Sequence, residues 1–481
     1  MTGGNWLKSA VALLFGLLSW TTLPAQAQSC TLGNACEFVS CRSPAVSVPS
    51  ALWGQLRPTD SGQLPSLRDS TNFYDMIHFP GLDFPHWMSL DIANGWVFAA
   101  VDYGLEVWDA RSNPGNPHRV CQVGQSGFTA WPYQLHEGVP VRDVAVIQGK
   151  DHVAVVGLVG GAGFGVFDTT SKSGPQPRYG DIGKDVQGVY AASIGGHDYA
   201  FAGSPSYGLL AYDLSAALSL TSLCHDLSPL VDVCGVYLGQ LGTRTSFRYL
   251  DGESSVDGNR HFLAASSGNG RLGLEIWDVS QPASPQRILS ALPTVFVHGV
   301  ALWRQGSRYY LALRYDAGGG VGTPTVGRIY DVSCLETGQC SSLGSPLWSR
   351  SFPRSGDDYY VTHSESNGRP FVYFASYDRC NQLQPVQNEW LYDVNNPAAP
   401  VDITPPPKVI NGQLTGYWGW YYRGSATGFN QVSPRVGKFH GDYFYRAAHS
   451  IFDVHKWVNP NAIFSDGFES GNLSRWDLVV P

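Results

Sequence analysis

The sequence predicts an all-β protein, a seven-bladed β-propeller with four-stranded antiparallel blades. Three observations support this fold class. An aromatic–Asp dipeptide recurs seven times along the chain, each copy follows runs of residues typical of strands, and turn signals separate these runs. The composition agrees, because the 481 residues include 55 Gly, 31 Pro and 3 Met, and only 15% are charged. Such a low charged fraction is unusual for a protein built from solvated helices.

The repeated dipeptide is an aromatic residue followed by Asp, with an aliphatic or small residue before it. Its seven copies are Trp108-Asp109, Phe167-Asp168, Tyr212-Asp213, Trp277-Asp278, Tyr330-Asp331, Tyr392-Asp393 and Phe452-Asp453. Self-similarity on a scale of about 57 residues indicates a repeat architecture with one supersecondary unit per repeat. Each Asp is expected to accept hydrogen bonds from backbone N–H groups two residues on and so begin a turn.

Each unit contains the signals of four strands. A β-rich run such as "RYYLALRY" (308–315) precedes the dipeptide, and another such as "VHGVALW" (297–303) lies further upstream. Turns such as "RQGSR" separate the two runs, as expected for a hairpin. After the dipeptide come Pro-rich turns such as "SQPASP" and then a short strand such as "QRILSAL" (286–292). A four-stranded sheet with two apolar faces must be covered on both sides, and radial stacking of seven such sheets achieves this.

The last unit has no evident fourth strand. After "HSIFDVHKWV" the sequence turns to "NPNAIFSDG", whereas "SALWGQL" (50–56) near the N-terminus resembles "SPLWSRS" (345–351). We therefore expect residues 50–57 to supply the outer strand of the last blade and close the ring, which hides the strand edges. The alternative is that 50–57 form a free loop and the propeller is open.

The two ends of the chain differ from the repeats and define four regions. Lys8 precedes an apolar run, Ala10 to Trp20, and Ala25-Gln26-Ala27 fits the cleavage pattern of a secretory signal peptide. The regions are a signal peptide (1–27), a Cys-containing segment (28–49), the propeller (50–460) and a C-terminal tail (461–481). We expect an exported product, extracellular, at the cell surface or periplasmic. No later segment has about 18 uninterrupted apolar residues, so no transmembrane segment is predicted.

The nine cysteines of an exported chain should mostly form disulfides. The disulfide candidates are the residues that lie close together in sequence: Cys30, Cys36 and Cys41; Cys224 and Cys234; Cys334 and Cys340. The odd total leaves at least one thiol free or bonded to another chain, and the spacing alone does not give the connectivity.

Two segments resemble known families. The stretch "GLEIWDVSQPASP" (273–285) resembles the LVIVD repeat, and "YDVNNPAAP" (392–400) matches nearly as well. The resemblance implies a secreted or surface-located bacterial propeller, and it supplies no catalytic residues. The tail "IFSDGFESGNLSRWDLVVP" (463–481) resembles a short Asp-Gly-Phe-Glu-Ser-Gly tail at the ends of exported bacterial proteins. It is interpreted either as an export or attachment signal or as a strand packed on the propeller.

The candidate binding residues are polar side chains expected near the start of the innermost strands, where they would line the central channel. Alignment of the units gives the candidates His86, Arg142, Gln187, His298, His363 and Arg423. Unit 4 is ambiguous between Arg248 and Glu253, and Tyr421 is a second candidate in unit 7. A ring of His, Arg and Gln would suit an anion, a carboxylate-bearing ligand or a metal. The alternative is a water-filled channel without a ligand.

The three histidines of this set, His86, His298 and His363, are candidates for a metal site, because imidazole nitrogens bind zinc and copper. The same groups could act as a general base and a charge stabiliser. The sequence leaves open whether the protein has no cofactor or holds a transition metal.

These observations favour a non-enzymatic binding or scaffolding protein outside the cell or at its surface, with a ligand in the channel or on the loop faces. The first alternative is a metal-dependent hydrolase or lyase that uses the channel His and Arg residues. The second is a carbohydrate-binding protein that uses loop aromatics such as Trp418 and Trp420. A protein or glycan partner fits the first hypothesis, whereas a net charge of −8 argues against a nucleic acid. The fold alone does not decide between them.

Overall fold

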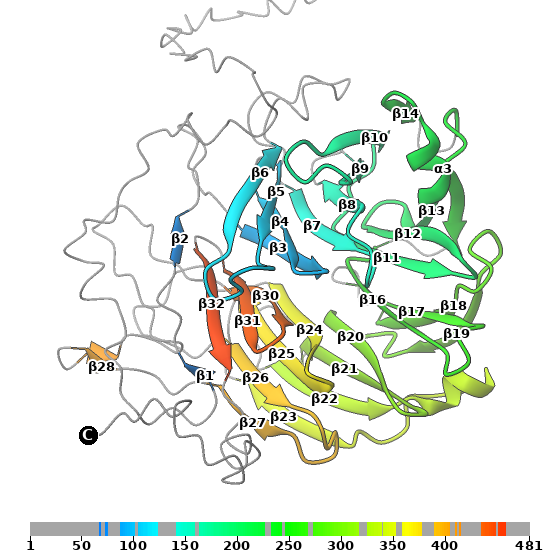
Figure 1. Cartoon of the computed structure of the whole chain (residues 1–481). Coiled ribbons are helices and arrows are strands. Elements are labelled where there is room, and N and C mark those ends of the chain that lie inside the picture. Colours follow the sequence, from blue (N-terminus) through cyan, green and yellow to red (C-terminus); the bar gives the residue numbers. More distant parts are fainter. Residues whose placement is uncertain are drawn as a thin grey trace, which may run out of the picture.

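Seven antiparallel sheets surround a central axis, and each forms one blade of a β-propeller (Figure 1). The predicted fold class is confirmed. The computed structural model describes residues 67–68, 73–75, 87–101, 104–123, 141–158, 163–226, 232–242, 246–267, 273–316, 325–338, 340–352, 358–377, 389–404, 409–410, 413–414, 434–448 and 451–457.

The strands of each blade follow one another in chain order, from the central channel outward. Blade 1 has β3 (Trp87–Ala93), β4 (Trp96–Val101), β5 (Gly104–Asp109) and β6 (His118–Val123); blade 2 has β7 (Val141–Val146), β8 (Val153–Leu158), β9 (Gly163–Asp168) and β10 (Gln176–Asp181); blade 3 has β11 (Gly188–Ile194), β12 (His197–Ser204), β13 (Gly208–Asp213) and β15 (Tyr237–Leu241); blade 4 has β16 (Tyr249–Ser254), β17 (His261–Ser266), β18 (Leu274–Asp278) and β19 (Gln286–Ala291); blade 5 has β20 (Val297–Gln305), β21 (Arg308–Asp316), β22 (Thr325–Asp331) and β23 (Trp348–Phe352); blade 6 has β24 (Asp358–Ser366), β25 (Arg369–Tyr377), β26 (Glu389–Asp393) and β27 (Val401–Asp402); blade 7 has β30 (Pro434–His440), β31 (Tyr443–Ala448) and β32 (Ile451–Trp457). A short hairpin, β28 (Val409–Ile410) and β29 (Gln413–Leu414), lies between blades 6 and 7 in the sequence.

The aromatic–Asp dipeptide ends the third strand of blades 1 to 6, as the repeat predicts. In five of these blades an Asp oxygen accepts the backbone N–H two residues on, at 2.9–3.0 Å. The donors are Arg111, Thr170, Ser280, Ser333 and Asn395. The predicted hydrogen bond that begins the turn is therefore confirmed in these five blades. In blade 3 the Asp213 side chain instead caps a helix.

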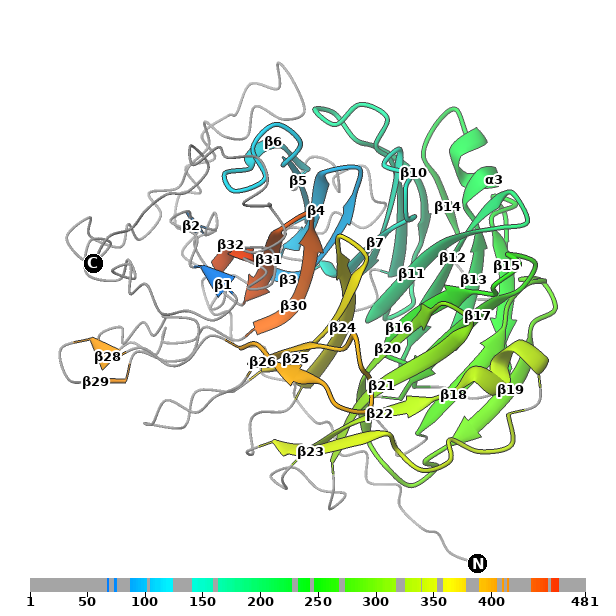
Figure 2. The same cartoon turned by 60° about the horizontal axis from the view of Figure 1, so that its bottom comes forward.

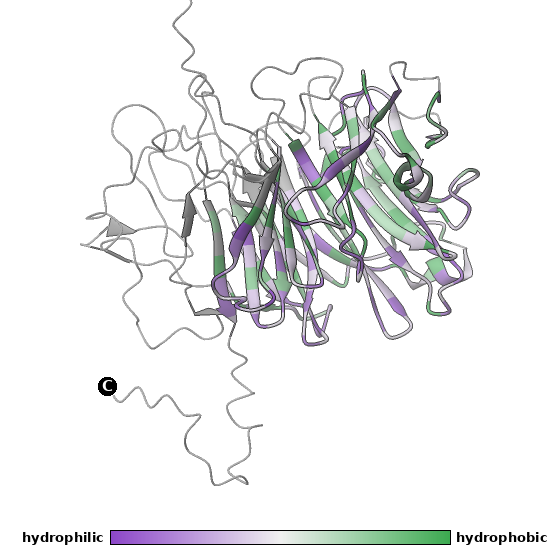
Figure 3. Cartoon of the chain, turned by 45° about the horizontal axis from the view of Figure 1, so that its top comes forward, coloured by the Kyte–Doolittle hydropathy of each residue, from purple (hydrophilic) through white to green (hydrophobic). Residues whose placement is uncertain are grey.

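The hydrophobic core lies between the blades. Each cluster of buried side chains joins neighbouring sheets; Phe164 of blade 2, for example, stacks on Tyr212 of blade 3 with ring centroids 4.1 Å apart. Hydrophobic residues run along the strands and hydrophilic residues gather at many of the turns (Figure 3). Because each blade packs on its two neighbours, the ring is the smallest unit that buries all of these faces.

Two glycines let neighbouring inner strands approach closely. A Cβ on Gly188 of β11 would lie 1.9 Å from the carbonyl oxygen of Arg248 in the next blade. A Cβ on Gly299 of β20 would lie 2.6 Å from the backbone nitrogen of Val361 in blade 6. No side chain fits at either distance, which explains why glycine interrupts the apolar runs "VQGV" and "VHGV".

An insertion in blade 3 adds a fifth strand to blade 2, a feature that the sequence did not predict. After β13, the Asp213 side chain caps helix α3 (Leu214–Ser219) by accepting the N–H of Ala216 at 2.9 Å. Strand β14 (Cys224–Asp226) then pairs in parallel with β10 of blade 2, beside which α3 also lies (Figure 2). The Cys224–Cys234 disulfide links the start of β14 to the segment that precedes β15. This excursion explains the longest interval of the repeat, between Asp213 and Asp278.

An N-terminal segment closes the ring, as predicted. Strands β1 (Leu67–Arg68) and β2 (Phe73–Asp75) both pair antiparallel with β32, the outermost of the three C-terminal strands of blade 7. The predicted segment, 50–57, lies outside the described residues.

Two of the predicted close cysteine couples form disulfides. Besides Cys224–Cys234, Cys334 is bonded to Cys340 across the 3₁₀ helix η2 (Ser333–Thr337). Cys30, Cys36 and Cys41 lie outside the described residues. Within the described part of the chain, no helix has the length and apolar character needed to span a membrane.

Candidate functional site in the central channel

The inner strands of all seven blades surround a cavity of about 500 Å³ on the propeller axis. These strands are β3, β7, β11, β16, β20, β24 and β30, and consecutive members contact one another around the ring. Residues on a closed ring of strands have little freedom to move, so the cavity is a preformed site rather than a gap between loops.

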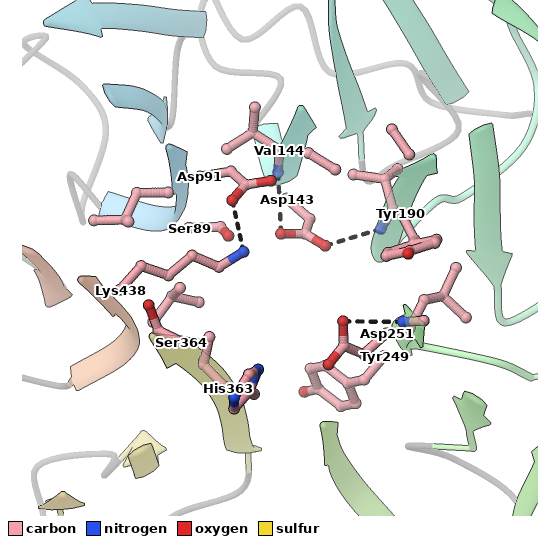
Figure 4. A pocket seen from close by; sticks show the side chains of 18 of the residues that line it. Ser89, Asp91, Asp143, Val144, Tyr190, Tyr249, Asp251, His363, Ser364 and Lys438 are labelled. Carbon is pink, nitrogen blue, oxygen red and sulfur yellow. Dashed lines mark hydrogen bonds and ion pairs between the residues drawn. The ribbon is translucent and has the colours of Figure 1, made fainter. Parts of the chain in front are cut away.

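Three aspartates from different blades point into this cavity: Asp91 of β3, Asp143 of β7 and Asp251 of β16 (Figure 4). Asp91 and Asp143 sit in mainly apolar strands, whereas β16 also contains Glu253 and Ser254. Five carboxylates line the cavity against three basic side chains, so carboxylates are in excess. The acids are Asp91, Asp143, Asp251, Glu253 and Glu365, and the bases are Arg142, Arg304 and Lys438.

Each of the three aspartates links its own inner strand to that of the next blade. One carboxylate oxygen accepts the N–H of the following residue, and the other accepts an N–H from the neighbouring blade at 2.8–2.9 Å. The neighbouring donors are Val146 for Asp91, Val189 for Asp143 and Leu302 for Asp251. Hydrogen bonds from N–H groups to an ionised acceptor are stronger than neutral ones, so these contacts help to hold the ring together.

Lys438 of β30 brings a positive charge to the same space. Its Nζ lies 2.6 Å from Oδ1 of Asp91. Burial disfavours the charge on Lys438, but the nearby carboxylates of Asp91, Asp251 and Asp143 outweigh this effect and raise its pKa. The amine therefore stays protonated at neutral pH and acts as a cation rather than as a nucleophile.

Burial raises the pKa of two of the carboxyl groups, Asp143 to about 6 and Asp251 to about 7. Backbone hydrogen bonds and the charge of Lys438 oppose this shift without cancelling it. Both groups thus change charge near neutral pH, and together they supply up to two negative charges to the cavity beyond the Asp91–Lys438 pair.

Among the buried polar atoms of the cavity wall without a hydrogen-bond partner in the described part of the protein are Nε2 of His363, Oε1 of Gln187 and Nε of Arg304. The Gln187 amide donates from Nε2 to the carboxylate of Asp185 at 3.1 Å, which fixes its oxygen as the unused atom. His363 stacks on Trp303 with centroids 5.3 Å apart. Burial, and secondarily the charge of Lys438, lowers its pKa to about 3, so the imidazole is neutral and one ring nitrogen can accept.

Aromatic rings complete the cavity wall. Tyr190, Tyr249 and Tyr360 all line it, and the rings of Tyr249 and Tyr360 meet edge to face with centroids 5.3 Å apart. The Tyr190 hydroxyl lies 3.0 Å from Nε2 of His261, whose Nδ1 lies 3.0 Å from the Ser254 hydroxyl. These contacts fix the orientation of Tyr190 beside Asp251.

The structure brings together some of the sequence-predicted residues. Arg142, Gln187 and His363 line the cavity, as does Glu253, the second candidate of unit 4. His298 does not line it; it is buried and its Nε2 faces Asp316 at 3.3 Å.

Two predicted residues, His86 and Arg423, lie outside the described part of the chain. The sequence alignment placed the inner strand of blade 7 around Tyr421. In the structure β30, later in the chain, is the inner strand. Among the described residues, no group of three or more His, Cys, Asp or Glu side chains is arranged to hold a metal.

The sequence interpretation missed the three aspartates, although a local signal for them existed. The segments "SLDI", "VRDV" and "YLDG" each place an Asp third in the run, within an inner strand. The alignment used the first residues of the strands, so it selected Arg142 and passed over its neighbour Asp143.

Comparisons with known proteins identify no family. No protein-family model matches the chain, and no curated protein matches it. Similar solved structures include the computationally designed Ika8 protein, which is 11% identical with a TM-score of 0.40 over 80% of this chain and 99% of that one. Another is the Kuenenia stuttgartiensis hydrazine synthase, 9% identical with a TM-score of 0.47 over 79% and 99%. Neither likeness bears on function.

Proposed function

We propose that the protein is an exported, non-enzymatic binding propeller that holds a small ligand in its central cavity. The observation that carries this proposal is the cavity of about 500 Å³, to which all seven inner strands contribute polar, charged and aromatic side chains. Its size lies in the range of small-molecule sites, and its charged groups and aromatic rings offer specific contacts to a ligand.

The roles of the charged groups favour binding over catalysis. The carboxylates of Asp91, Asp143 and Asp251 accept hydrogen bonds from the next blade, so moving them would disturb the ring. Lys438 keeps its proton beside Asp91, which makes it a poor nucleophile. Of the histidine candidates for the metal-dependent alternative, His298 lies beside Asp316 and does not line the cavity.

Export is supported by the two disulfides of the described residues, because such bonds persist in oxidising compartments. The leader-like residues 1–27 and the resemblance to the LVIVD repeat point the same way. The proposed location is therefore outside the cytoplasm: extracellular, at the cell surface or in the periplasm.

A ligand screen with a blocked cavity tests the binding function. The full chain is screened by thermal shift against small amines, carboxylates and sugars. Each bound compound is then recovered, and its mass is measured by mass spectrometry. We expect at least one class to raise the Tm and to be recovered unchanged. Thr362→Trp, which fills the cavity from β24, should abolish the shift. Thr337→Trp on the exposed surface of η2 should retain it.

Two results would contradict the proposal. Chemical conversion of the bound compound would show an enzyme. One zinc or copper ion per purified chain, lost in His363→Ala, would support the metal-dependent alternative. Mass spectrometry of the secreted protein tests export separately, and we expect its first residue to be Gln28.

A further inference from the structure

Among the described residues that line the central cavity, five carboxylates face three basic side chains, and this charge imbalance bears on the chemistry of the ligand. Lys438 forms an ion pair with Asp91 and so matches one carboxylate. Asp143 and Asp251 have no ion-pair partner of this kind among the described residues; their hydrogen bonds run to backbone N–H groups and, for Asp143, to the Ser89 hydroxyl. A carboxylate has about four acceptor positions, so each retains capacity for a further donor.

Two uncharged polar atoms of the cavity wall add acceptor capacity: Oε1 of Gln187, and Nε2 of His363 when the ring proton is on Nδ1. Nε2 of His363 and Oε1 of Gln187 are buried in the cavity wall, and neither has a hydrogen-bond partner in the described structure. A buried acceptor without a donor is costly, so a ligand that brings N–H groups gains from these atoms as well as from the carboxylates. They come from blades 6 and 3, whereas the carboxylates come from blades 2 and 4.

The aromatic wall adds a second kind of attraction for cations. The rings of Tyr190 and Tyr249 lie beside Asp251 in Figure 4, and Tyr360 packs against Tyr249. The face of a tyrosine ring carries partial negative charge and attracts an ammonium group within about 6 Å. A carboxylate next to aromatic faces favours an organic cation over an anion or an uncharged sugar.

We propose that the central cavity binds a small organic diamine, with one ammonium group at Asp251 and the second at Asp143. This inference rests on the proposed binding function and adds the ligand class to it. Each ammonium group supplies three donors, which match the carboxylate, imidazole and amide acceptors. A divalent metal ion fits less well, because Lys438 holds a positive charge beside Asp91 and the described carboxylates do not form a group able to coordinate one.

Isothermal titration calorimetry with three probes of equal chain length tests the ligand class. The probes are 1,4-diaminobutane, 1,4-butanediol and succinate, each titrated into the full chain at pH 8. We expect the diamine to bind and the other two to bind more weakly by about tenfold or more, the factor expected for one hydrogen bond to a charged group. Equal or tighter binding of succinate or butanediol would overturn the proposal.

Substitutions locate the diamine within the cavity. Asp251→Asn should weaken diamine binding by about tenfold or more, while its side-chain oxygen can still accept the Leu302 N–H. Asp402→Asn, on the exposed outer strand of blade 6, should bind as the natural protein does. Unchanged affinity in Asp251→Asn, or diamine binding that survives Thr362→Trp, would overturn the proposal.

A pH comparison on the natural protein gives the same information without a substitution. Asp143 and Asp251 are largely ionised at pH 8 and protonated at pH 5, so diamine binding should weaken by about tenfold or more at pH 5. The other titratable or charged groups that face them are Asp91, Glu253, Glu365, Lys438, Arg142, Arg304 and His363. Affinity that is equal at both pH values would contradict the assignment.

The design separates the two proposals. If succinate raises the Tm and Thr362→Trp abolishes that effect, the cavity binds ligands but the diamine class is wrong. If neither the three probes nor the screened compounds bind, the binding function itself fails.

Discussion

Lys438 in blade 7 and Asp91 in blade 1 form an ion pair across the seam of the propeller, with Nζ 2.6 Å from Oδ1. The two residues are 347 positions apart in the sequence. Asp91 also accepts the N–H of Val146 in blade 2, so this single carboxylate links three consecutive blades. The ring is thus joined near its axis by charged groups as well as at its rim by strand pairing.

Removal of the Lys438 charge should destabilise the whole ring. In Lys438→Met, Asp91 loses its counter-ion in a site where the lysine and aspartate side chains are only 29% and 13% exposed. Loss of one partner of a buried pair costs 3–5 kcal/mol, and because the cavity admits water we expect about 2–3 kcal/mol in the free energy of unfolding from urea titration. Arg308→Met, which removes a surface partner 4.0 Å from Asp331, should cost less than about 1 kcal/mol. Equal losses in the two variants would contradict this role.

The raised pKa of Asp251 predicts a specific dependence of stability on pH. The folded chain holds this proton up to about pH 7, whereas the unfolded chain releases it near pH 4. The folded state therefore binds more protons between these values, and the stabilisation from protonation is lost as the pH rises through about 7. We expect the natural protein to lose stability relative to Asp251→Asn between pH 5 and pH 8, measured by urea unfolding at each pH.

A comparison of variants is needed because other groups titrate in the opposite sense. His261 and His363 have a pKa lowered to about 4 and about 3 by burial, so acid destabilises the fold through them. Both proteins share these histidines, and their effect cancels in the difference. Asp257→Asn is the control, because the pKa of this turn residue is lowered to about 2 and its contribution lies below this pH range. A difference that stays constant from pH 5 to pH 8 would contradict the prediction for Asp251.

A second ion pair should be critical at the interface between blades 6 and 7. Glu389 of β26 accepts Nη1 of Arg446 in β31 at 2.5 Å, and both side chains are at most 2% exposed. Glu389→Gln leaves the buried guanidinium without its carboxylate, which should cost about 3–5 kcal/mol in unfolding free energy. Asp402→Asn removes an exposed partner of Arg350 and should cost less than about 1 kcal/mol. A small loss in Glu389→Gln would show that water or a neighbouring group replaces the carboxylate.

The blades could be predicted because their determinants are local. In Trp277-Asp278 the aromatic ring packs between blades, and the Asp begins the next turn through the N–H of Ser280. The turn contact acts within a few residues and recurs in five blades, so the pattern is visible in one chain. The seven third strands and most of their neighbours follow directly from this pattern.

The channel could not be predicted in the same way, because its determinants lie between units. Asp143 matters through a backbone N–H of Val189, 46 residues later, and nothing within its own unit marks that contact. Strand β14 is a similar case, since it leaves blade 3 to pair with β10 of blade 2. Periodicity describes one unit at a time and says little about such exchanges.

The pairing of β1 and β2 with β32 also affects which shielding the repeats need and how the ring folds. Open arrays of repeats need specialised terminal repeats to shield their two exposed ends. A closed ring has no ends, so none of the seven blades has to act as a cap. Closure has a kinetic consequence, because blade 7 joins β1 and β2 to β30, β31 and β32, and this pairing closes a loop that spans nearly the whole propeller. Closure of this seam is therefore expected to be the final step of folding.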